Sequence, residues 1–322
     1  MKISHLSLRG VASLPDMECD FVSPTTGRPH DLIVISGPPA SGKTRLCEVM
    51  LAVLETVGAY QGMVRASDWY ADETRGARVE MEFFWDGGST IGTPTGQTPR
   101  AVVDFNGSGV RFEIDRALGR LLARYDHDPA HGKREYFSEG RQRAWGARED
   151  GTAPIEQALL RSSKDPQKYS CIPRFLGELR KDEARERTFA SALELLTPTV
   201  RFSAAPRAGD MTACFAKYDG ARANFAGLSS SEADAVIIAA TAAMIGLNHS
   251  MVFLDRPELY VPPERLVQWV QALGRIGSNN QWFIASNDES LAASVDRSQH
   301  IALGKGDGLS APSSRRLSWR PS

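Results

Sequence analysis

The chain has 322 residues, of which 42% are hydrophobic and 24% are charged. This balance is typical of a globular protein with a sizeable core, and it excludes collagen, disordered chains and low-complexity sequences. Lys and Arg together number 38 against 39 for Asp and Glu, so the net charge of −1 gives the whole protein no attraction to nucleic acid or to an anionic membrane.

Membrane segments and metal or disulfide frameworks are not expected. The apolar run from Ala235 to Leu247 is shorter than the roughly 18–20 residues of a membrane span. The first residues lack the apolar core and the cleavage site of a secretory signal. The four cysteines are scattered without a Cys-x-x-Cys pair, which indicates free thiols rather than a zinc site or disulfides. We therefore expect a cytoplasmic protein with no membrane partner.

The first part of the chain predicts strands, a glycine-rich turn and a helix. Apolar and polar residues alternate through residues 3–8 and 17–21, which indicates two N-terminal strands. The apolar run from Leu32 to Ile35 indicates a buried strand. After the turn, apolar residues recur every three or four positions from Leu46 to Leu54, as on one face of a helix.

The turn between that strand and that helix fits the phosphate-loop pattern G-x-x-x-x-G-K-[ST]. Its eight residues are Gly37, Pro38, Pro39, Ala40, Ser41, Gly42, Lys43 and Thr44. Glycines let the backbone turn around phosphates, and the amides at the start of the helix point at them. We expect Lys43 to neutralise the β and γ oxygens of a bound nucleotide and the Thr44 hydroxyl to ligate Mg²⁺.

The rest of the chain divides into a charged helical region and an alternating region. A strand is predicted at residues 78–85 and a loop at 86–96. Residues from about 110 to 200 are expected to form a helical insertion, because apolar residues recur there at helical spacing in a charged background. Then follow a helix at 229–247, a strand at 251–254, a helix at 263–275, a strand at 281–285 and a flexible tail at 305–322. This alternation predicts a single α/β domain over residues 1–322, with a mostly parallel sheet flanked by helices.

Two further landmarks lie in the last third of the chain. The segment Leu228-Ser229-Ser230-Ser231-Glu232 opens a predicted helix, and Asp255 ends an apolar strand. A carboxylate at the end of a strand holds Mg²⁺ in phosphate-loop enzymes, so Asp255 is the predicted partner of Thr44. On its own, the first segment is also a good helix cap, with serine before the helix and an acid in its first turn.

These motifs, in this order, resemble those of the ABC-type ATPase heads of the SMC, RecF and OLD group. That family has an early phosphate loop, a helical or coiled-coil insertion, a Leu-Ser-x-Gly-Glu/Gln signature, and an apolar strand that ends in Asp-Glu-Pro-Glu-Leu. Here the last motif is matched by Asp255-Arg256-Pro257-Glu258-Leu259, and the opening strands by the run from Lys2 to Gly10. Between Gly87 and Phe225 the resemblance is carried by few residues, such as the run from Tyr136 to Arg141.

The resemblance implies a P-loop NTPase fold of the ABC type with N-terminal antiparallel strands, and it implies ATP and Mg²⁺ as cofactors. It also implies that Ser229, Ser230 and Ser231 grip the γ-phosphate of ATP bound to Lys43, Thr44 and Asp255 of a second subunit, so that ATP joins two heads. The implied partners are this second ATPase subunit, in a homodimer, and a separate effector or scaffold protein.

The chain departs from the family pattern in its candidate catalytic residues. Arg256 stands where the family has a glutamate that positions or deprotonates the attacking water, and an arginine cannot act as a base near neutral pH. Glu258 is the nearest replacement. Asn287 stands where the family has a histidine that contacts the γ-phosphate, and it can still donate a hydrogen bond. Ser231 replaces the signature glycine, and Gln61 is a candidate for the family's glutamine loop. These changes predict a head that binds ATP and dimerises but hydrolyses ATP slowly.

The predicted function is an ATP-dependent conformational switch for a partner, in DNA repair, chromosome maintenance or defence against foreign DNA. The alternatives are a pseudo-ATPase scaffold, which Arg256 and Asn287 favour, and an ATPase stimulated by DNA as a further partner. Two basic clusters bear on DNA binding, namely Arg141, Arg143 and Arg148, and then Arg180, Lys181, Arg185 and Arg187. Acidic residues are interleaved with both, which is more typical of a solvated helical face than of a nucleic-acid surface.

Overall fold

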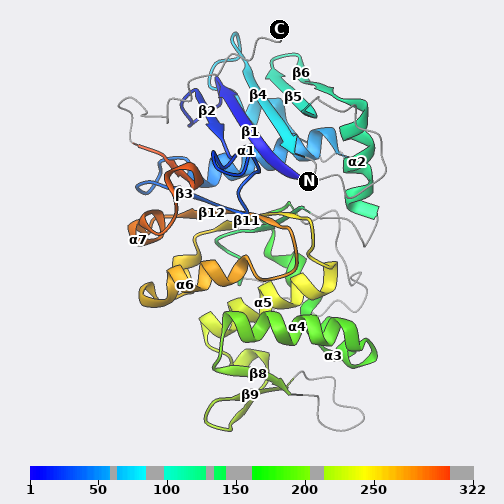
Figure 1. Ribbon diagram of the computed structural model, residues 1–322. Helices are drawn as coiled ribbons and strands as arrows, with labels where there is room; N and C mark the ends of the chain where they lie inside the picture. Colours follow the sequence, from blue (N-terminus) through cyan, green and yellow to red (C-terminus); the bar gives the residue numbers. More distant parts are fainter. Residues whose placement is uncertain (59–63, 85–97, 128–133, 143–161, 204–213, 305–322) are drawn as a thin grey trace.

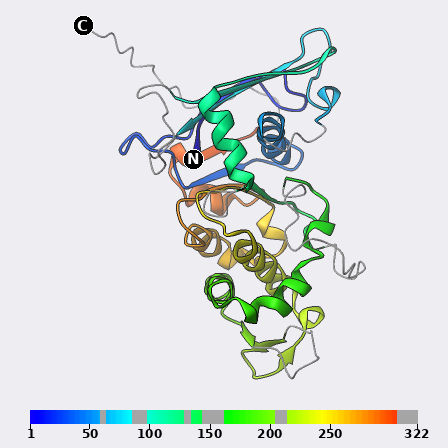
Figure 2. The same cartoon turned by 90° about the vertical axis from the view of Figure 1, so that its right-hand side faces the viewer.

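The structure is a computed structural model that describes residues 1–58, 64–84, 98–127, 134–142, 162–203 and 214–304 (Figure 1). An antiparallel sheet lies at the top of Figure 1, a parallel sheet crosses the middle, and a group of helices lies below it. The same order of layers is seen from the side in Figure 2. In the part of the chain that the structure describes, no helix is long and apolar enough to cross a membrane.

Five strands form the parallel sheet in the order β13-β3-β12-β11-β7. They are β3 (Leu32–Ser36), β7 (Arg134–Phe137), β11 (Met251–Asp255), β12 (Gln281–Ser286) and β13 (His300–Ala302). β11 and β12 are buried at every position, which explains their nearly continuous apolar sequences. Because the strands are parallel, their carboxyl ends lie at one edge, and the residues that follow them meet there.

The antiparallel sheet has the order β2-β1-β4-β5-β6. Its strands are β1 (Lys2–Arg9), β2 (Met17–Asp20), β4 (Ala77–Phe84), β5 (Arg100–Asn106) and β6 (Gly109–Ile114). Helix α1 (Lys43–Val57) packs in one core with strands of both sheets. The inward residues of β4 alternate with exposed or half-buried ones, as a sheet with one covered face requires. α2 (Arg116–His127) follows β6.

Successive residues of β11 face two different cores. Met251 and Phe253 belong to the core that contains α1 and the antiparallel sheet. Val252 and Leu254 belong to a second core on the other face, among the lower helices. This alternation follows from the period of two residues in a strand. The parallel sheet is therefore the shared wall of two cores, and residues at its carboxyl edge are held from both sides.

Helix α5 (Ser230–Ile245) lies at the centre of the lower core and is buried from Glu232 to Ile245. A helix that is apolar all round needs cover on every side. The other helices of this layer are α3 (Ile172–Glu178), α4 (Glu183–Leu196), α6 (Pro263–Leu273) and the short α7 (Glu289–Ala293). Beyond them lies a small sheet of β8 (Val200–Ser203), β9 (Cys214–Lys217) and β10 (Arg222–Ala223).

Most of the predicted elements around the phosphate loop are confirmed, including the strands at 78–85, 251–254 and 281–285, which are β4, β11 and β12. The helical insertion expected at 110–200 differs. Its first residues belong to β6, and β7 interrupts it and joins the parallel sheet beside β11. β7 is fully buried yet begins with two charged residues, which concealed it.

The two charged residues of β7 both have hydrogen-bond partners inside the protein. The Arg134 guanidinium donates to the carbonyl oxygen of Leu54, and Glu135 accepts a hydrogen bond at 2.9 Å from Lys168. The sequence alone shows the charges but not these distant partners. The loop predicted at 86–96 and the tail predicted at 305–322 lie outside the described residues.

Candidate nucleotide-binding site

The phosphate loop connects β3 to α1 at the carboxyl edge of the parallel sheet. Gly37 and Gly42 have φ values of 151° and 98°, which residues with a side chain rarely adopt. A Cβ atom on Gly37 would lie 2.2 Å from the Leu303 carbonyl oxygen, and one on Gly42 would lie 2.7 Å from Leu14 Cδ2. Glycine is therefore required at both ends of the loop for its backbone conformation and for space.

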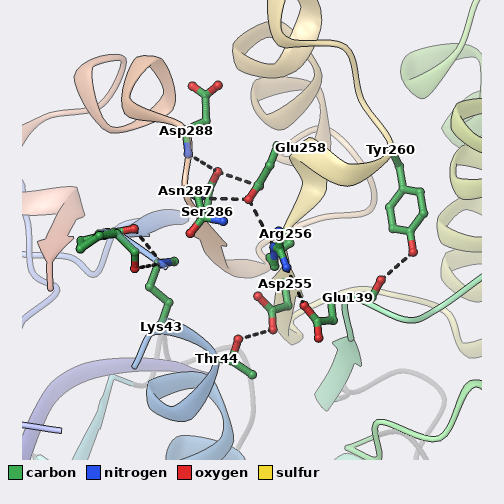
Figure 3. Close-up of polar contacts among 12 residues, drawn as sticks. Lys43, Thr44, Glu139, Asp255, Arg256, Glu258, Tyr260, Ser286, Asn287 and Asp288 are labelled. Atoms are coloured by element: carbon green, nitrogen blue, oxygen red, sulfur yellow. Dashed lines mark hydrogen bonds and ion pairs between the residues drawn. The ribbon is translucent and has the colours of Figure 1, made fainter. Parts of the chain in front are cut away.

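The Lys43 ammonium lies against the loop that precedes it (Figure 3). It donates to the carbonyl oxygens of Gly37 at 2.7 Å and Pro38 at 2.8 Å. Burial lowers the pKa of Lys43, while the carboxylates of Glu258 and Asp255 act in the opposite direction. The cation is thus placed where the loop amides and the start of α1 favour an anion.

Thr44 and Asp255 are brought together as predicted. The Thr44 hydroxyl donates to Asp255 Oδ2 at 2.7 Å, and the Tyr136 hydroxyl lies 3.3 Å from the same oxygen. Burial raises the pKa of the Asp255 carboxyl and the charge of Glu139 adds to this, whereas the hydrogen bonds from Thr44 and Tyr136 oppose it. Asp255 itself is fully buried at the end of β11.

These residues fit a Mg²⁺ ion. Asp255 Oδ1 is buried without a hydrogen-bond partner among the described residues, so one carboxylate oxygen is left for a ligand. A hydroxyl and a carboxylate are hard oxygen donors, and Mg²⁺ is commonly held by one or two such groups together with substrate phosphates. No cluster of three His, Cys, Asp or Glu that could hold a metal by itself occurs in the described ranges.

Arg256 occupies the next position after Asp255. Its backbone is left-handed, with φ at 50°, and its amide donates to the Ala285 carbonyl oxygen at 2.8 Å. The guanidinium NH1 donates to Glu139 Oε2 at 3.0 Å, and Nε lies 3.7 Å from Glu258 Oε1. Arg256 therefore stands between two carboxylates beside the predicted Mg²⁺ site (Figure 3).

Glu258, the candidate catalytic carboxylate predicted from the sequence, has both carboxylate oxygens engaged. Oε2 accepts a hydrogen bond from the Ser286 hydroxyl at 2.8 Å, and Oε1 accepts one from the backbone amide of Asn287 at 3.1 Å. Glu258 thereby ties the 3₁₀ helix η6 (Pro257–Leu259) to the end of β12. The side-chain oxygen of Asn287 is buried and lacks a hydrogen-bond partner among the described residues.

The segment from Ser229 to Ser231 forms the cap of α5 that its sequence suggests. Ser229 Oγ accepts from the Glu232 amide at 3.4 Å, and Glu232 Oε2 accepts from the Ser229 amide at 2.8 Å. The side chains of Ser229 and Ser230 are exposed. The cap leaves the amides of Ser230 and Ser231 at the start of the helix, where a helix offers donors to an anion.

Three residues of the site were missed by sequence reasoning, namely Glu139, Tyr136 and Asp234. Arg141 was predicted to belong to a solvated basic cluster, with nucleic-acid binding as the less favoured alternative, and both are wrong for Arg141 because the residue is fully buried. Its guanidinium is paired with the buried Asp234 carboxylate and donates to the Asp255 carbonyl oxygen at 2.9 Å.

A single signal in the sequence pointed to this pair. Asp234 is the one charge inside the otherwise apolar body of α5, and a buried carboxylate requires a cationic partner. The pair is covered by Tyr260, whose ring lies 4.4 Å from the Arg141 guanidinium and whose hydroxyl donates to the Glu139 carbonyl oxygen at 2.6 Å. The segment after β7 is thereby fixed to β11 and to α5.

Two arginines of the second basic cluster form ion pairs within their own helical segment. Arg185 and Arg187 pair with Asp182 and Glu183 of the same helical segment, at 3.4 Å and 3.7 Å. They form the solvated face that the mixed charges predicted. Gln61, Arg143 and Arg148 lie outside the described residues.

No family model and no curated protein matches the chain. Solved structures with a similar fold are SMC head domains. One, an SMC head bound to the C-winged helix domain of ScpA, is 14% identical over 94% of each chain, with a TM-score of 0.59. The SMC head domain from Thermotoga maritima is 13% identical over 94% of each chain, with a TM-score of 0.51.

A third similar structure is an SMC head with an extended coiled coil, bound to the C-terminal domain of ScpA derived from Pyrococcus furiosus. It is 12% identical over 94% of this chain and 93% of that chain, with a TM-score of 0.56. Identities this low establish the fold alone. The chain thus has the fold of an SMC head, which is an ABC-type fold of the P-loop ATPases.

Proposed function

We propose that the protein is an ABC-type ATPase head that binds Mg-ATP. The observation that carries this proposal is the junction of the phosphate loop with β11. There the Lys43 ammonium lies on the loop, Thr44 bonds to Asp255 at 2.7 Å, and the second Asp255 oxygen lacks a hydrogen-bond partner among the described residues. In this proposal Lys43 binds the β- and γ-phosphates, and Thr44 and Asp255 hold Mg²⁺, which neutralises phosphate charge.

The proposed action is ATP-dependent pairing of two heads. Nucleotide held by Lys43, Thr44 and Asp255 of one subunit would meet the Ser229–Ser231 turn of the other. The exposure of Ser229 and Ser230 and the capped start of α5 support this role, because the helix presents amides and the positive end of its dipole at the surface. We propose a homodimer as the simplest arrangement.

The output we propose is a conformational switch that captures or releases a partner protein. Two of the similar SMC heads were solved bound to domains of ScpA, so heads of this fold bind partner proteins. DNA repair, chromosome maintenance and defence against foreign DNA are the proposed settings.

We also propose that hydrolysis is slow. Arg256 stands in the position where the resemblance implies a water-activating glutamate, and it cannot accept a proton near neutral pH. Glu258 is held by Ser286 and Asn287, which supports a positioning role for this acid. Asn287 lies at the same edge and can donate a hydrogen bond to phosphate.

The test of the switch is the solution mass of the protein with and without Mg-ATP, with phosphate release followed in the same samples. We expect an ATP-dependent rise in mass with slow release of phosphate, and no rise in Lys43→Ala. A matched control is Lys181→Ala, which removes an exposed lysine from another surface. An unchanged mass with no bound nucleotide would contradict the proposal.

Hydrolysis is tested separately by restoring a carboxylate. Arg256→Glu alone would face two carboxylates, because Glu139 lies 3.0 Å and Glu258 lies 3.7 Å from the Arg256 guanidinium. The double variant Arg256→Glu with Glu139→Gln removes the nearer of the two repulsions, and we expect it to raise the turnover of ATP. Loss of turnover in Glu258→Gln would instead assign the base role to Glu258.

A pseudo-ATPase scaffold is the second candidate, and the replacement at Arg256 favours it. A scaffold would bind nucleotide, or dimerise, without any response of its mass to Mg-ATP. The same mass measurement therefore separates the two functions.

A further inference from the structure

The Arg256–Glu139 ion pair lies at the open side of the proposed nucleotide site. Both side chains are reachable by solvent, with 36% of Arg256 and 51% of Glu139 exposed. They come from the ends of neighbouring parallel strands, because β11 and β7 are paired up to Leu254 and Phe137. The pair is therefore placed by the sheet and is not held by deep burial.

The Arg256 guanidinium uses only part of its donor capacity. NH1 bonds to Glu139, whereas Nε is buried without a hydrogen-bond partner among the described residues and lies 3.7 Å from Glu258 Oε1. A guanidinium offers five N–H donors in a planar fork that suits phosphate oxygens. Arg256 thus has donors left over beside the place proposed for the phosphates.

Arg256 and Lys43 flank one contact. Thr44, the residue after Lys43, donates to Oδ2 of Asp255, the residue before Arg256, at 2.7 Å. Two cations that face one region are stabilised by an anion between them. In a bound nucleoside triphosphate, that anion is the terminal γ-phosphate, which a nucleoside diphosphate lacks.

We propose that Arg256 recognises the terminal phosphate of bound ATP, and that this phosphate competes with the Glu139 carboxylate for the Arg256 guanidinium. The proposal rests on the proposed function, since it needs a nucleotide beside Lys43. Arg256 is then the residue that makes the site prefer a triphosphate over a diphosphate. Glu139 opposes this preference, because it holds the same guanidinium.

Hydrogen bonds join the segment that contains Glu139 to the start of α5, which is the proposed dimer surface. Glu139 belongs to the segment after β7, whose Gln142 side chain donates to the Ser230 carbonyl oxygen at the start of α5. The Tyr260 hydroxyl bonds to the Glu139 backbone and keeps this segment next to η6. The Glu139 side chain can therefore exchange its partner while the backbone of its segment stays bonded to Tyr260 and to the start of α5.

The test is the affinity for ADP and for a non-hydrolysable ATP analogue, adenosine 5′-(β,γ-imido)triphosphate, each with Mg²⁺, by titration calorimetry. We expect Arg256→Gln to lower the ratio of analogue to ADP affinity by about tenfold, the loss expected for one charge-assisted hydrogen bond. Glu139→Gln should raise the ratio by about two- to fivefold, because it frees the guanidinium. Arg256→Lys, which keeps the charge but not the fork, should fall between wild type and Arg256→Gln.

The double variant and a control complete the design. In the Arg256→Gln background, Glu139→Gln should change nothing further, because the two side chains act through one pair. Arg78→Gln is the matched control, since Arg78 forms an ion pair of similar length and exposure with Asp104, at 3.1 Å, on the antiparallel sheet. It should leave the ratio unchanged.

Two results would overturn the proposal. One is an unchanged ratio in Arg256→Gln, which would make the pair structural only. The other is a lower ratio in Glu139→Gln, which would mean that Glu139 itself contacts the ligand. If the proposed function itself is wrong, the result is different, because the wild-type protein then binds neither nucleotide.

Discussion

The two sides of the proposed nucleotide pocket are built in different ways. On one side, the loop from Gly37 to Thr44 is contiguous in sequence, and its shape depends on backbone conformations that favour glycine. On the other side, Glu139 and Arg256 come from the ends of two strands that lie far apart in the sequence, and side-chain charges hold them together. The first side depends on space and backbone, and the second depends on which charges stand opposite each other.

This difference indicates which part of such a site can acquire a new function. A backbone cradle encloses phosphates whatever side chains surround it. A set of opposed charges takes a new role when one member changes sign, and the cradle need not move. The resemblance implies a carboxylate at the position of Arg256, and such a replacement is a change of this second kind. The following predictions test whether the two sides respond as differently as their construction implies.

The largest effect is expected from the buried pair that supports the charged side. Arg141→Met leaves the Asp234 carboxylate buried without its partner, and we expect the free energy of unfolding to fall by about 3–5 kcal/mol. Urea denaturation measures this fall. Arg141→Met combined with Asp234→Leu removes both charges and should recover most of the loss, whereas a single-variant loss below about 1 kcal/mol would show that the pair is not a support.

The next effect concerns the backbone-built side and its one essential charge. Lys43→Ala should lower the affinity for Mg-ATP by about a hundredfold or more, which corresponds to about 2.7 kcal/mol. The fold should persist, because Lys43 bonds only to its own loop in the contacts described. Calorimetric titration with ATP measures the loss. An affinity equal to that of Lys181→Ala would contradict the role of Lys43 in binding ATP.

A smaller effect is expected at Gly42, where the steric contact of an added side chain can be distinguished from backbone strain. Gly42→Ala should cost about 1–3 kcal/mol of stability, because φ is 98° and the new methyl group would meet Leu14 Cδ2 at 2.7 Å. Gly109→Ala is the matched control, since Gly109 has a φ of 117° but no atom within 4 Å of the added carbon. The new methyl group would also lie 2.9 Å from the Ser13 carbonyl oxygen, and equal thermal shifts for the two variants would show that these two contacts are unimportant.

The smallest effect is a pH dependence at β13, the strand next to β3. Burial lowers the pKa of His300 below 6.5, and its Nε2 lies 2.6 Å from the Ser36 hydroxyl. From about pH 6.5 downward the unfolded chain therefore binds more protons than the folded one, so this residue costs stability as the pH falls. In His300→Gln the drop in melting temperature between pH 7 and pH 5 should be smaller by about 2 °C. An identical drop would show that His300 does not titrate in this range.

The sequence predicts the backbone-built side almost completely. The phosphate-loop motif, the apolar strand before it and the helical spacing after it are all local, and each is confirmed by β3 and α1. β11 and β12 are equally readable, because a strand covered on both faces is apolar throughout. The contact between Thr44 and Asp255 was predicted from two motifs, the phosphate loop and the apolar strand that ends in an acid.

The charged side was not readable in the same way. β7 begins with Arg134 and Glu135, whose partners lie far away in the chain, so no period marks it as a buried strand. Arg141 looked like a surface charge because Asp234, its partner, is 93 residues distant. An acid inside an apolar helix, such as Asp234, indicates that a cationic partner exists, but only the fold shows which residue it is.

Helix α5 has few degrees of freedom because of its one internal charge. Its surface from Glu232 to Ile245 is buried, so the apolar contacts alone would allow it to roll about its axis or slide along it. A slide by one turn, about 5.4 Å, would carry Asp234 out of reach of Arg141. Since Arg141 also bonds to the Asp255 backbone, α5 and the end of β11 are expected to move as one rigid body. Any displacement of the Ser229 turn is then expected to move the end of β11, and with it Asp255, in the same direction.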